Sequence, residues 1–540
     1  MKILLVGGYG VFGARLARLL VADGHDVCVA GRRLDKARAS ARELECRAVR
    51  FDRAEGRYAL EGHDVVIDAA GPFHAYGEAP YRLARAAVAA GVHYLDLSDD
   101  AEFCAGMGAL DADARAAGVC VLSGLSSVPA LSSAAVRALA GGERPVVIDT
   151  AILPGNRAPR GLSVMRSILS QAGRPMPVWR GNRWEWAHGW SGPAEYRLPG
   201  GLVRQGWQIG VPDQRLFPAH FGAATVRFRA GLELGVMRYG LALFAGLRRV
   251  VPVPVTPFVV RLFKLAADGL APFGSGRGGM SVSVTTRHEI RSWRLLAEDG
   301  DGPFIPAVAA RALLRRAALP VGAGPALEVI SLAEAEAAMA DLRVVTERDV
   351  APVSFLFASV LGAEFAALPE EIRATHLTLG VSRWEGRCEV RRGKGLWPRL
   401  LCAIFRFPPE AADVPVEVTK TVTPRGETWV RRFGRSAFRS HLSRDESGLC
   451  ERFGPFTFRI GLEVRDGALH YPVTGGRIGP VRLPNWLLPG SVAREFAAEG
   501  RFHFDVALLA PLTQAPLVHY RGFLVAAAAD DPAEPPGGRA

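Results

Sequence analysis

The sequence has few cysteines, no long apolar run and no spacing typical of a metal site. Its seven cysteines are odd in number and scattered, without a Cys-x-x-Cys motif. We therefore expect reduced, mostly buried thiols in a cytoplasmic protein, and no metal site. No stretch reaches the roughly 18 uninterrupted apolar residues that indicate a transmembrane helix. The short apolar run at the N-terminus leads straight into a glycine loop and is not typical of a signal peptide.

Lysine is also scarce, so the positive charge is almost entirely arginine. Lys and Arg together number 66 against 54 Asp and Glu, which gives a formal net charge of +12. No run of like charges is typical of a nucleic-acid-binding arm, so we expect no nucleic-acid partner. The excess positive charge favours anionic partners, such as a cofactor phosphate or a membrane surface. A chain of 540 residues should also form more than one domain.

The first thirteen residues predict a dinucleotide-binding loop. Ile3 to Val6 form an apolar run typical of a buried strand, and Leu16, Leu19 and Leu20 continue with helical spacing. Between them the glycines follow the pattern Gly-x-Gly-x-x-Gly, which allows a tight turn, close approach of a pyrophosphate and close packing of the helix. The predicted cofactor-binding residues of this loop are Gly8, Tyr9, Gly10, Val11, Phe12 and Gly13.

The end of the second predicted strand favours NADP(H) over NAD. The strand at 25–30 is followed by Gly31, Arg32 and Arg33, where an NAD-binding protein usually has an acidic residue for the ribose hydroxyl. Two guanidinium groups suit a 2′-phosphate, although a solvated helix start would also explain them. Asp52, after a third strand at 47–51, is a further candidate on the adenine side.

Alternating strands and helices over the first 125 residues predict a doubly wound parallel sheet. Further strands are expected at 64–68, 92–97 and 119–122. The strand that ends at Asp68 opens into a loop of small residues at the carboxyl edge of the sheet, where ligands bind in such folds. This loop adds Ala70, Gly71 and Pro72 to the predicted cofactor site.

Three motifs in register show a family resemblance. They are Gly71-Pro-Phe-His-Ala-Tyr-Gly77, Ala90-Gly-Val-His-Tyr-Leu-Asp-Leu-Ser98 and Ser126-Ser-Val-Pro-Ala-Leu-Ser132. Behind a glycine loop, they resemble the saccharopine-dehydrogenase-like oxidoreductases, which implies an NADP(H)-binding Rossmann domain and hydride transfer. The chain departs from the family pattern, because Ser98-Asp99-Asp100 replaces the usual Thr-Gly-Glu and Ser126 replaces an Asp. A substrate other than saccharopine is therefore expected.

The candidates for handling a proton lie at the same carboxyl edge. His74 and Tyr76 follow the fourth strand, Asp96, Ser98 and Asp99 end the fifth, and Ser126 and Ser127 follow the sixth. Each of them can instead have a structural role, such as capping a helix. We name Tyr76, Asp96 and Ser98 as the catalytic candidates and favour Tyr76, because a phenol can donate a proton to a carbonyl oxygen.

The middle of the chain, residues 131–348, is expected to form an α+β substrate domain. Tryptophans crowd the segment 179–207 between arginines, which fits hairpins with aromatic pairs or an aromatic wall of a substrate pocket. A strand is expected at 280–296, a helix at 307–318 and a strand at 327–330. The apolar stretch 235–273 carries basic residues and fits a buried helix, a homodimer contact or peripheral contact with a membrane.

Residues 352–526 predict a separate β-rich α+β domain. Strands are expected at 416–422, 427–433 and 456–460. Five segments resemble an uncharacterised bacterial domain that is often fused behind saccharopine-dehydrogenase-like halves; they are Gly362-Ala-Glu-Phe, Trp429-Val-Arg-Arg-Phe-Gly434, Glu451-Arg-Phe-Gly-Pro455, Phe502-His-Phe-Asp-Val506 and Val518-His-Tyr-Arg-Gly522. Paired aromatics at 456 and 458 and at 502 and 504 fit either a packed core or a cup for an apolar ligand. Residues 527–540 are expected to be a disordered tail.

Together these features predict an α/β protein with three domains, at residues 1–130, 131–348 and 352–526. The expected function is an NADP(H)-dependent oxidoreductase that transfers hydride to or from a small, apolar molecule. The expected location is the cytoplasm, with possible contact at the inner face of the membrane. The alternative is a catalytically silent NADP(H)-binding protein that associates with a membrane or with another protein.

Overall fold

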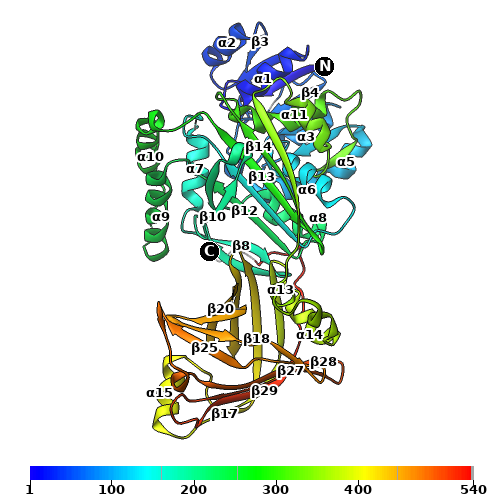
Figure 1. The fold of residues 1–540 in the computed structure, drawn as a ribbon. Helices are drawn as coiled ribbons and strands as arrows, with labels where there is room; N and C mark the ends of the chain where they lie inside the picture. Colours follow the sequence, from blue (N-terminus) through cyan, green and yellow to red (C-terminus); the bar gives the residue numbers. More distant parts are fainter. Residues whose placement is uncertain (57, 160, 252, 447, 537–540) are drawn as a thin grey trace. The chain divides into compact units, whose positions relative to one another are not determined.

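The structure is a computed structural model that describes residues 1–540 except 57, 160, 252, 447 and 537–540 (Figure 1). The chain forms two compact units. The N-terminal unit comprises residues 1–179, 183–351 and 531–540, and the C-terminal unit comprises residues 180–182 and 352–530. The seven cysteines are free and all but Cys46 are buried, as the sequence predicts. No helix of the described residues is long and apolar enough to cross a membrane.

The first sheet of the N-terminal unit is parallel and has seven strands, in the order β15-β6-β5-β4-β1-β2-β3. Apolar residues on one face pack under α1, α2 and α11, and those on the other under α3, α4 and α5, so the predicted doubly wound fold is confirmed. The strands are β1 (Lys2–Val6), β2 (Asp26–Gly31), β3 (Arg47–Arg50), β4 (Val65–Asp68), β5 (His93–Asp96), β6 (Cys120–Ser123) and β15 (Gly322–Pro325). The helices are α1 (Gly13–Ala22), α2 (Leu34–Glu43), α3 (Arg82–Ala89), α4 (Ala101–Gly106), α5 (Asp111–Ala117) and α11 (Ile305–Leu314).

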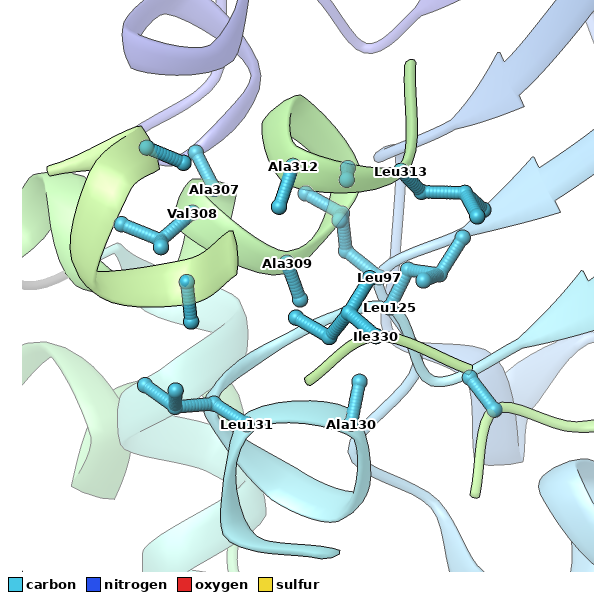
Figure 2. Packing of buried hydrophobic residues seen from close by; sticks show 14 of the residues in the cluster. Leu97, Leu125, Ala130, Leu131, Ala307, Val308, Ala309, Ala312, Leu313 and Ile330 are labelled. Carbon is cyan, nitrogen blue, oxygen red and sulfur yellow. The ribbon is translucent and has the colours of Figure 1, made fainter. Parts of the chain in front are cut away.

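The seventh strand comes from a distant part of the sequence. β15 pairs in parallel with β6, although about two hundred residues separate them. The strand predicted at 327–330 is wrong, because these residues form no ladder. Ile330 is apolar and buried there as part of the core rather than as part of a sheet. Figure 2 shows Ile330 beside Leu97 and Leu125 and below the alanine-rich face of α11.

The second sheet of the N-terminal unit is mixed, in the order β10-β11-β12-β7-β13-β14-β16. The single strand predicted at 280–296 is a hairpin instead, because the Thr286 hydroxyl accepts from the amides of His288 and Glu289 and turns the chain. The strands are β7 (Val147–Leu153), β10 (Ala194–Arg197), β11 (Val203–Gln208), β12 (Thr225–Gly231), β13 (Gly278–Thr285), β14 (Glu289–Ala297) and β16 (Val344–Pro352). The helices are α6 (Ser132–Ala140), α7 (Leu162–Gln171), α8 (Pro212–Phe221) and α12 (Leu332–Ala338).

The tryptophan-rich segment forms hairpins with paired rings, which agrees with the first of its two interpretations. Strands β8 (Pro175–Arg180) and β9 (Arg183–His188) pair with each other. The Trp179 and Trp184 rings meet edge to face at 5.1 Å, and those of Trp190 and Trp207 stack at 5.9 Å. The second pair belongs to a core with α7, α9 (Gly235–Val250) and α10 (Pro257–Gly269). Figure 1 shows α9 and α10 along the outer side of α7.

The C-terminal unit is a 13-stranded antiparallel sheet with short helices, in the order β23-β24-β27-β28-β29-β17-β18-β19-β20-β21-β22-β25-β26. The three strands predicted here are confirmed. The longer strands are β17 (Val381–Arg392), β18 (Ala411–Thr423), β19 (Gly426–Phe433), β20 (Ser436–Asp445), β21 (Gly448–Phe453), β22 (Phe456–Ile460), β25 (Val473–Ile478), β27 (Gly490–Ala498), β28 (Arg501–Leu509) and β29 (Pro516–Ala526). The short strands are β23 (Glu463–Arg465), β24 (Ala468–His470) and β26 (Val481–Arg482), and the helices are α13 (Leu356–Leu361), α14 (Glu370–His376) and α15 (Leu396–Ile404).

Part of the tail has a fixed position, contrary to the predicted disorder of residues 527–540. Within the N-terminal unit the Trp184 indole donates to the carbonyl of Asp531 at 3.0 Å, and Arg215 donates to the carbonyl of Ala533 at 2.8 Å. These side chains supply the hydrogen bonds that the polar, proline-containing composition did not reveal. Residues 537–540 lie outside the described part of the chain.

Candidate functional site

The loop between β1 and α1 has the geometry of a phosphate cradle. Gly7 takes the left-handed conformation (φ +76°) and its carbonyl accepts from the Gly10 amide at 2.8 Å. A Cβ on Gly13 would lie 2.3 Å from the Gly7 oxygen, so only glycine fits there. A Cβ on Gly10 would meet only that oxygen, at 3.1 Å. The space beside Gly10 is therefore the open side of the loop, where a pyrophosphate can approach the backbone.

The turn itself depends on Gly7, which precedes the Gly-x-Gly-x-x-Gly pattern and was not among the predicted loop residues. In the Gly-x-Gly-x-x-Gly pattern the first glycine, Gly8, is expected to make the tight turn, but the positive φ is at Gly7. Its Cβ position would be 2.7 Å from the Cα of Ala70, so Gly7 also lets the loop after β4 lie against the glycine loop. This contact brings Ala70, Gly71 and Pro72 next to the predicted phosphate site, because β1 and β4 are neighbours in the sheet.

Tyr9 and the arginines lie at the end of β2. The Tyr9 ring covers Gly31, where a Cβ would come within 2.4 Å of the ring, and its hydroxyl accepts from the Arg33 amide at 3.2 Å. The Arg33 guanidinium is not free, because it pairs with Asp35 at 2.7 Å. Arg32 is exposed, and no carboxylate of the described residues pairs with it. The two predicted phosphate-binding arginines therefore differ in availability.

The remaining predicted cofactor residues have mostly structural contacts. The Val11 carbonyl accepts from Arg15 at 2.6 Å, and a Cβ at Gly161, just before α7, would contact the Val11 side chain at 3.5 Å. Phe12 packs half-buried against the main core. Asp52 accepts from the Ala54 amide at 3.0 Å and so fixes the turn after β3.

Two buried carboxylates stand side by side at the carboxyl edge. Asp68 ends β4 and Asp96 ends β5, and the two residues are paired in register. Asp68 is held by Arg53 at 2.9 Å and by the Tyr76 hydroxyl at 3.2 Å, and the Arg53 guanidinium lies 3.2 Å from the centre of the Tyr76 ring. Burial raises the pKa of Asp68, and Arg53 opposes that shift.

Tyr76, our favoured proton donor, directs its hydroxyl into this cluster. Burial, followed by the nearby Asp68 charge, raises the pKa of the Tyr76 phenol. A phenol that already donates to a carboxylate holds its proton tightly, so this arrangement also suits a role in fixing the loop 71–77. The cluster partners Asp68 and Arg53 are absent from the sequence-based set. The signal that would have indicated Asp68 is its place at the end of β4, equivalent to Asp96 on β5.

Asp96 is buried beneath the adjoining loops. Its Oδ1 accepts from the amides of Ser98 and Gly124 at 2.9 and 2.8 Å and from the Ser123 hydroxyl at 2.9 Å. Its Oδ2 is buried and has no hydrogen-bond partner among the described residues. Burial raises the pKa of Asp96 to about 7, against these hydrogen bonds. Ser98 is fully buried, and its hydroxyl accepts from the Asp100 amide at 3.2 Å.

The comparisons with known proteins confirm the family resemblances predicted for the N-terminal and C-terminal segments. Residues 3–122 match the saccharopine dehydrogenase NADP binding domain, and residues 368–524 match a domain of unknown function, DUF4166. No curated protein matches the sequence. In the described part of the chain, no group of His, Cys, Asp and Glu side chains has the arrangement of a metal site.

The similar solved structures are distant. Apo saccharopine dehydrogenase (L-Glu forming) from Saccharomyces cerevisiae shares 15% identity over 65% of this chain and 99% of its own, with a TM-score of 0.44. The myo-inositol dehydrogenases of Corynebacterium glutamicum and Lactobacillus casei share 11% and 12% identity. They cover 51% and 66% of this chain and 96% and 98% of their own, with TM-scores of 0.23 and 0.28.

The assignment rests on the sequence matches and on the glycine-loop geometry rather than on these weak structural similarities. Among the glycines of the loop, Gly10 has the most open Cβ position, and it lies in the segment that matches the NADP-binding family. This match supports a generic oxidoreductase. The chain therefore carries a saccharopine-dehydrogenase-type NADP-binding domain in its N-terminal unit and a domain of unknown function in its C-terminal unit.

Proposed function

We propose that the protein is an NADP(H)-dependent oxidoreductase that transfers hydride between the nicotinamide and a small, largely apolar molecule. The observation that carries the proposal is the geometry of the glycine loop at the carboxyl edge of the first sheet. A side chain at Gly13 would clash with the backbone, whereas the space beside Gly10 is open to a pyrophosphate, and the segment matches an NADP-binding family. The cofactor supplies the hydride chemistry, and the chain has to bind it, orient the substrate and manage one proton.

The preference for NADP(H) follows from the end of β2. Arg32 is exposed and free to bind a 2′-phosphate, whereas Arg33 would first have to leave Asp35. Arg32→Ala should therefore weaken NADPH binding by about 1.5–3 kcal/mol, the usual contribution of a charged hydrogen bond, and Arg33→Ala should weaken it less. Neither change should alter NADH binding. Equal affinity of the wild-type protein for NADPH and NADH, measured by fluorescence titration, would contradict this preference.

The proton-handling candidates remain Tyr76, Asp96 and Ser98. Among them Asp96 has the pKa nearest neutrality, which is where a general acid or base works best. We therefore assign the role of general acid or base to Asp96, whereas Tyr76 and Asp68 hold the loop 71–77 in place. Asp96→Asn should remove the ionisation near pH 7 from the pH profile of turnover while NADPH binding persists. An unchanged profile would transfer the role to another group.

The reaction itself is tested by a substrate screen. Purified protein is incubated with NADPH, or with NADP⁺, and with metabolite or lipid extracts, and the absorbance of the reduced nicotinamide is followed. The Gly10→Ala variant serves as the matched control at NADPH concentrations near the wild-type Kd, because it should fold but bind the cofactor at least tenfold more weakly. Cofactor consumption only by the wild-type protein supports the oxidoreductase. NADPH binding without turnover in any extract supports the alternative, a silent NADP(H)-binding protein.

A second property is peripheral contact with the inner face of the cytoplasmic membrane through α9 and α10. Large apolar side chains on α9 recur at helical spacing and face solvent, with Leu243 78% exposed; they are Val236, Tyr239, Leu243, Leu247 and Val250. α10 adds Phe258, Leu262 and Leu265, and Phe273 follows. Such stripes are typical of interfacial helices and are too exposed for the buried helix considered above.

The arginines of helices α9 and α10 divide into a buried one and two exposed ones. Arg248 is buried and donates to the carbonyls of Leu169 and Ala172 at the end of α7, so it fixes the helix pair in place. Arg249 and Arg261 are exposed beside the apolar stripes, and no carboxylate of the described residues pairs with them. Their positive charges complement anionic lipid headgroups.

Vesicle sedimentation tests this contact. Leu243→Glu with Leu265→Glu should abolish binding to phosphatidylglycerol vesicles, whereas Val203→Glu, at a similarly exposed position on β11, should not. Arg249→Ala with Arg261→Ala should reduce binding to anionic vesicles but not to neutral ones. A vesicle-independent dimer that the double glutamate variant dissociates would instead assign the surface to homodimerisation.

A further inference from the structure

The C-terminal unit contains a cavity of about 450 Å³ that has no assigned role. Its walls include residues of β22 on one side and of β28 on the other. These strands are far apart in the sheet order, so the sheet curls around the cavity. The volume lies within the roughly 300–1,000 Å³ of small-molecule sites.

Inward-facing positions at period two make most of the wall apolar. The paired aromatics that the sequence singled out contribute to it, together with neighbours from β18 to β21 and from β29. These lining side chains include Phe433, Phe438, Leu442, Phe456, Phe458, Phe502, Phe504 and Tyr520. The aromatic alternation thus builds a core that leaves a cavity. A cavity with mostly apolar walls favours ligands with a large apolar surface.

The apolar wall continues to α15, where the surface is also apolar. Trp397, Leu401 and Ile404 of this helix line the cavity, and the Trp397 indole donates to the Pro511 carbonyl at 3.0 Å. Leu396 and Leu400 on the same helix face solvent, at 85% and 53% exposure. A hydrocarbon chain entering beside α15 would meet apolar side chains outside and inside the cavity.

Polar groups gather elsewhere on the wall, around Lys420. The Lys420 ammonium donates to the Thr375 carbonyl at 2.6 Å and lies 3.8 Å from the centre of the Trp429 ring. An ammonium has three N–H groups, and this carbonyl is its only hydrogen-bond acceptor among the described residues. Lys420 therefore retains donor capacity at the cavity wall.

The charged side chains around Lys420 carry no net positive charge. Arg431 pairs with Glu451 at 3.1 Å, and Arg494, which also lines the cavity, lies 3.7 Å from Asp505. Lys420 lies in the field of Glu495 and Glu427, so four carboxylates accompany three cations. Glu495 also contacts His376 and the Tyr471 hydroxyl, each at 2.6 Å. Burial lowers the pKa of His376 to about 4, so the imidazole is neutral at pH 7. An anionic head group would be repelled here, and a neutral oxygen would not.

We propose that this cavity binds an uncharged, elongated, hydrocarbon-rich molecule whose hydroxyl or carbonyl oxygen accepts a hydrogen bond from Lys420. The apolar wall takes the chain, and the net charge around Lys420 selects a neutral head over a carboxylate. The proposal does not depend on the oxidoreductase assignment, because it involves only residues of the C-terminal unit.

The test uses the full-length protein, Nile red as a fluorescent probe, and 1-dodecanol and dodecanoate as competitors of equal chain length. Dodecanol should displace Nile red at about tenfold lower concentration than dodecanoate at neutral pH, because a buried unpaired carboxylate is unfavourable. Lys420→Met should weaken dodecanol about fivefold, as expected for one lost hydrogen bond. Dodecanoate that competes as well as dodecanol would overturn the proposed head-group selection.

Two substitutions on β27 separate the cavity from other apolar surfaces. Ala493 lines the cavity, whereas its neighbour Val492 points outward and is 67% exposed. Ala493→Phe should abolish the dodecanol-sensitive Nile red signal, and Val492→Phe should preserve it. Nile red that binds at the exposed apolar surface of α9 and α10 contributes equally to the signal of both variants, so it does not affect the comparison between them. If Ala493→Phe does not fold, Ala493→Leu should still lower the signal. An unchanged signal in a folded Ala493 variant would refute a ligand in this cavity.

Discussion

The same substitution at two glycines of the nucleotide loop should weaken NADPH binding in both cases but reduce stability in only one. A Cβ on Gly10 meets only the Gly7 oxygen, at 3.1 Å, so Gly10→Ala should leave the free energy of unfolding within about 0.5 kcal/mol of wild type. The new methyl group then occupies the side on which a pyrophosphate approaches. Losing one or two charged hydrogen bonds, each about 1.5–3 kcal/mol, should weaken NADPH binding at least tenfold.

Gly13→Ala changes the fold instead. Its Cβ would lie 2.3 Å from the Gly7 oxygen and 3.0 Å from the Gly8 Cα, both of them backbone atoms that cannot rotate away. Overpacking of this kind costs about 1–3 kcal/mol or more, and the gain in helix propensity of Ala over Gly, about 1 kcal/mol, offsets only part of it. We expect a net loss of about 1–2 kcal/mol together with lost NADPH binding.

Urea unfolding and NADPH fluorescence titration on the two variants and the wild-type protein separate these effects. The reasoning is refuted if Gly10→Ala binds NADPH normally while folded, because the pyrophosphate must then lie elsewhere. It is also refuted if Gly13→Ala is as stable as wild type, because the loop would then not have the close Gly7–Gly13 contact.

Two further predictions concern stability. Arg311 is 2% exposed and binds Asp23 at the end of α1 and Asp341 beyond α12, so Arg311→Met should destabilise the protein by about 3 kcal/mol in urea unfolding. The exposed Arg348→Met, which breaks only a pair with Glu336, should cost under about 1 kcal/mol, and similar losses for both would argue against a special role of Arg311. The raised pKa of Asp96 favours the folded state when the carboxyl is protonated, so wild-type stability should fall as pH rises from about 4, the unfolded value, to about 7. Asp96→Asn keeps an oxygen for the three hydrogen-bond donors of Asp96 and removes the titration. The stability of the variant relative to wild type should therefore rise by a few kcal/mol between about pH 4 and pH 7. A difference that does not change with pH would show that the pKa of Asp96 is not raised.

The sequence by itself determined the local features of this protein. The apolar run at Ile3 to Val6, the glycine spacing and the alternation of strands and helices predicted the parallel sheet, because backbone conformation and burial follow from neighbouring residues. The same local logic predicted the cofactor loop and the strands around Trp429 and Phe456. Local patterns also showed that Arg32 occupies the position where a carboxylate would select NAD.

Only the tertiary structure decided what depends on distant contacts. β15 joined the first sheet from far along the chain, and Gly7, which has the positive φ of the turn, also lets Ala70 pack against it. Asp68, Arg53 and Tyr76 form one cluster because the loop after β3 reaches the end of β4, although β1 and β2 lie between these two strands in the sheet. The availability of Arg32 and Arg33 differed because Asp35 pairs with the second. Whether the aromatics of the C-terminal unit fill a core or leave a cavity depends on how the sheet curls, which no local pattern specifies.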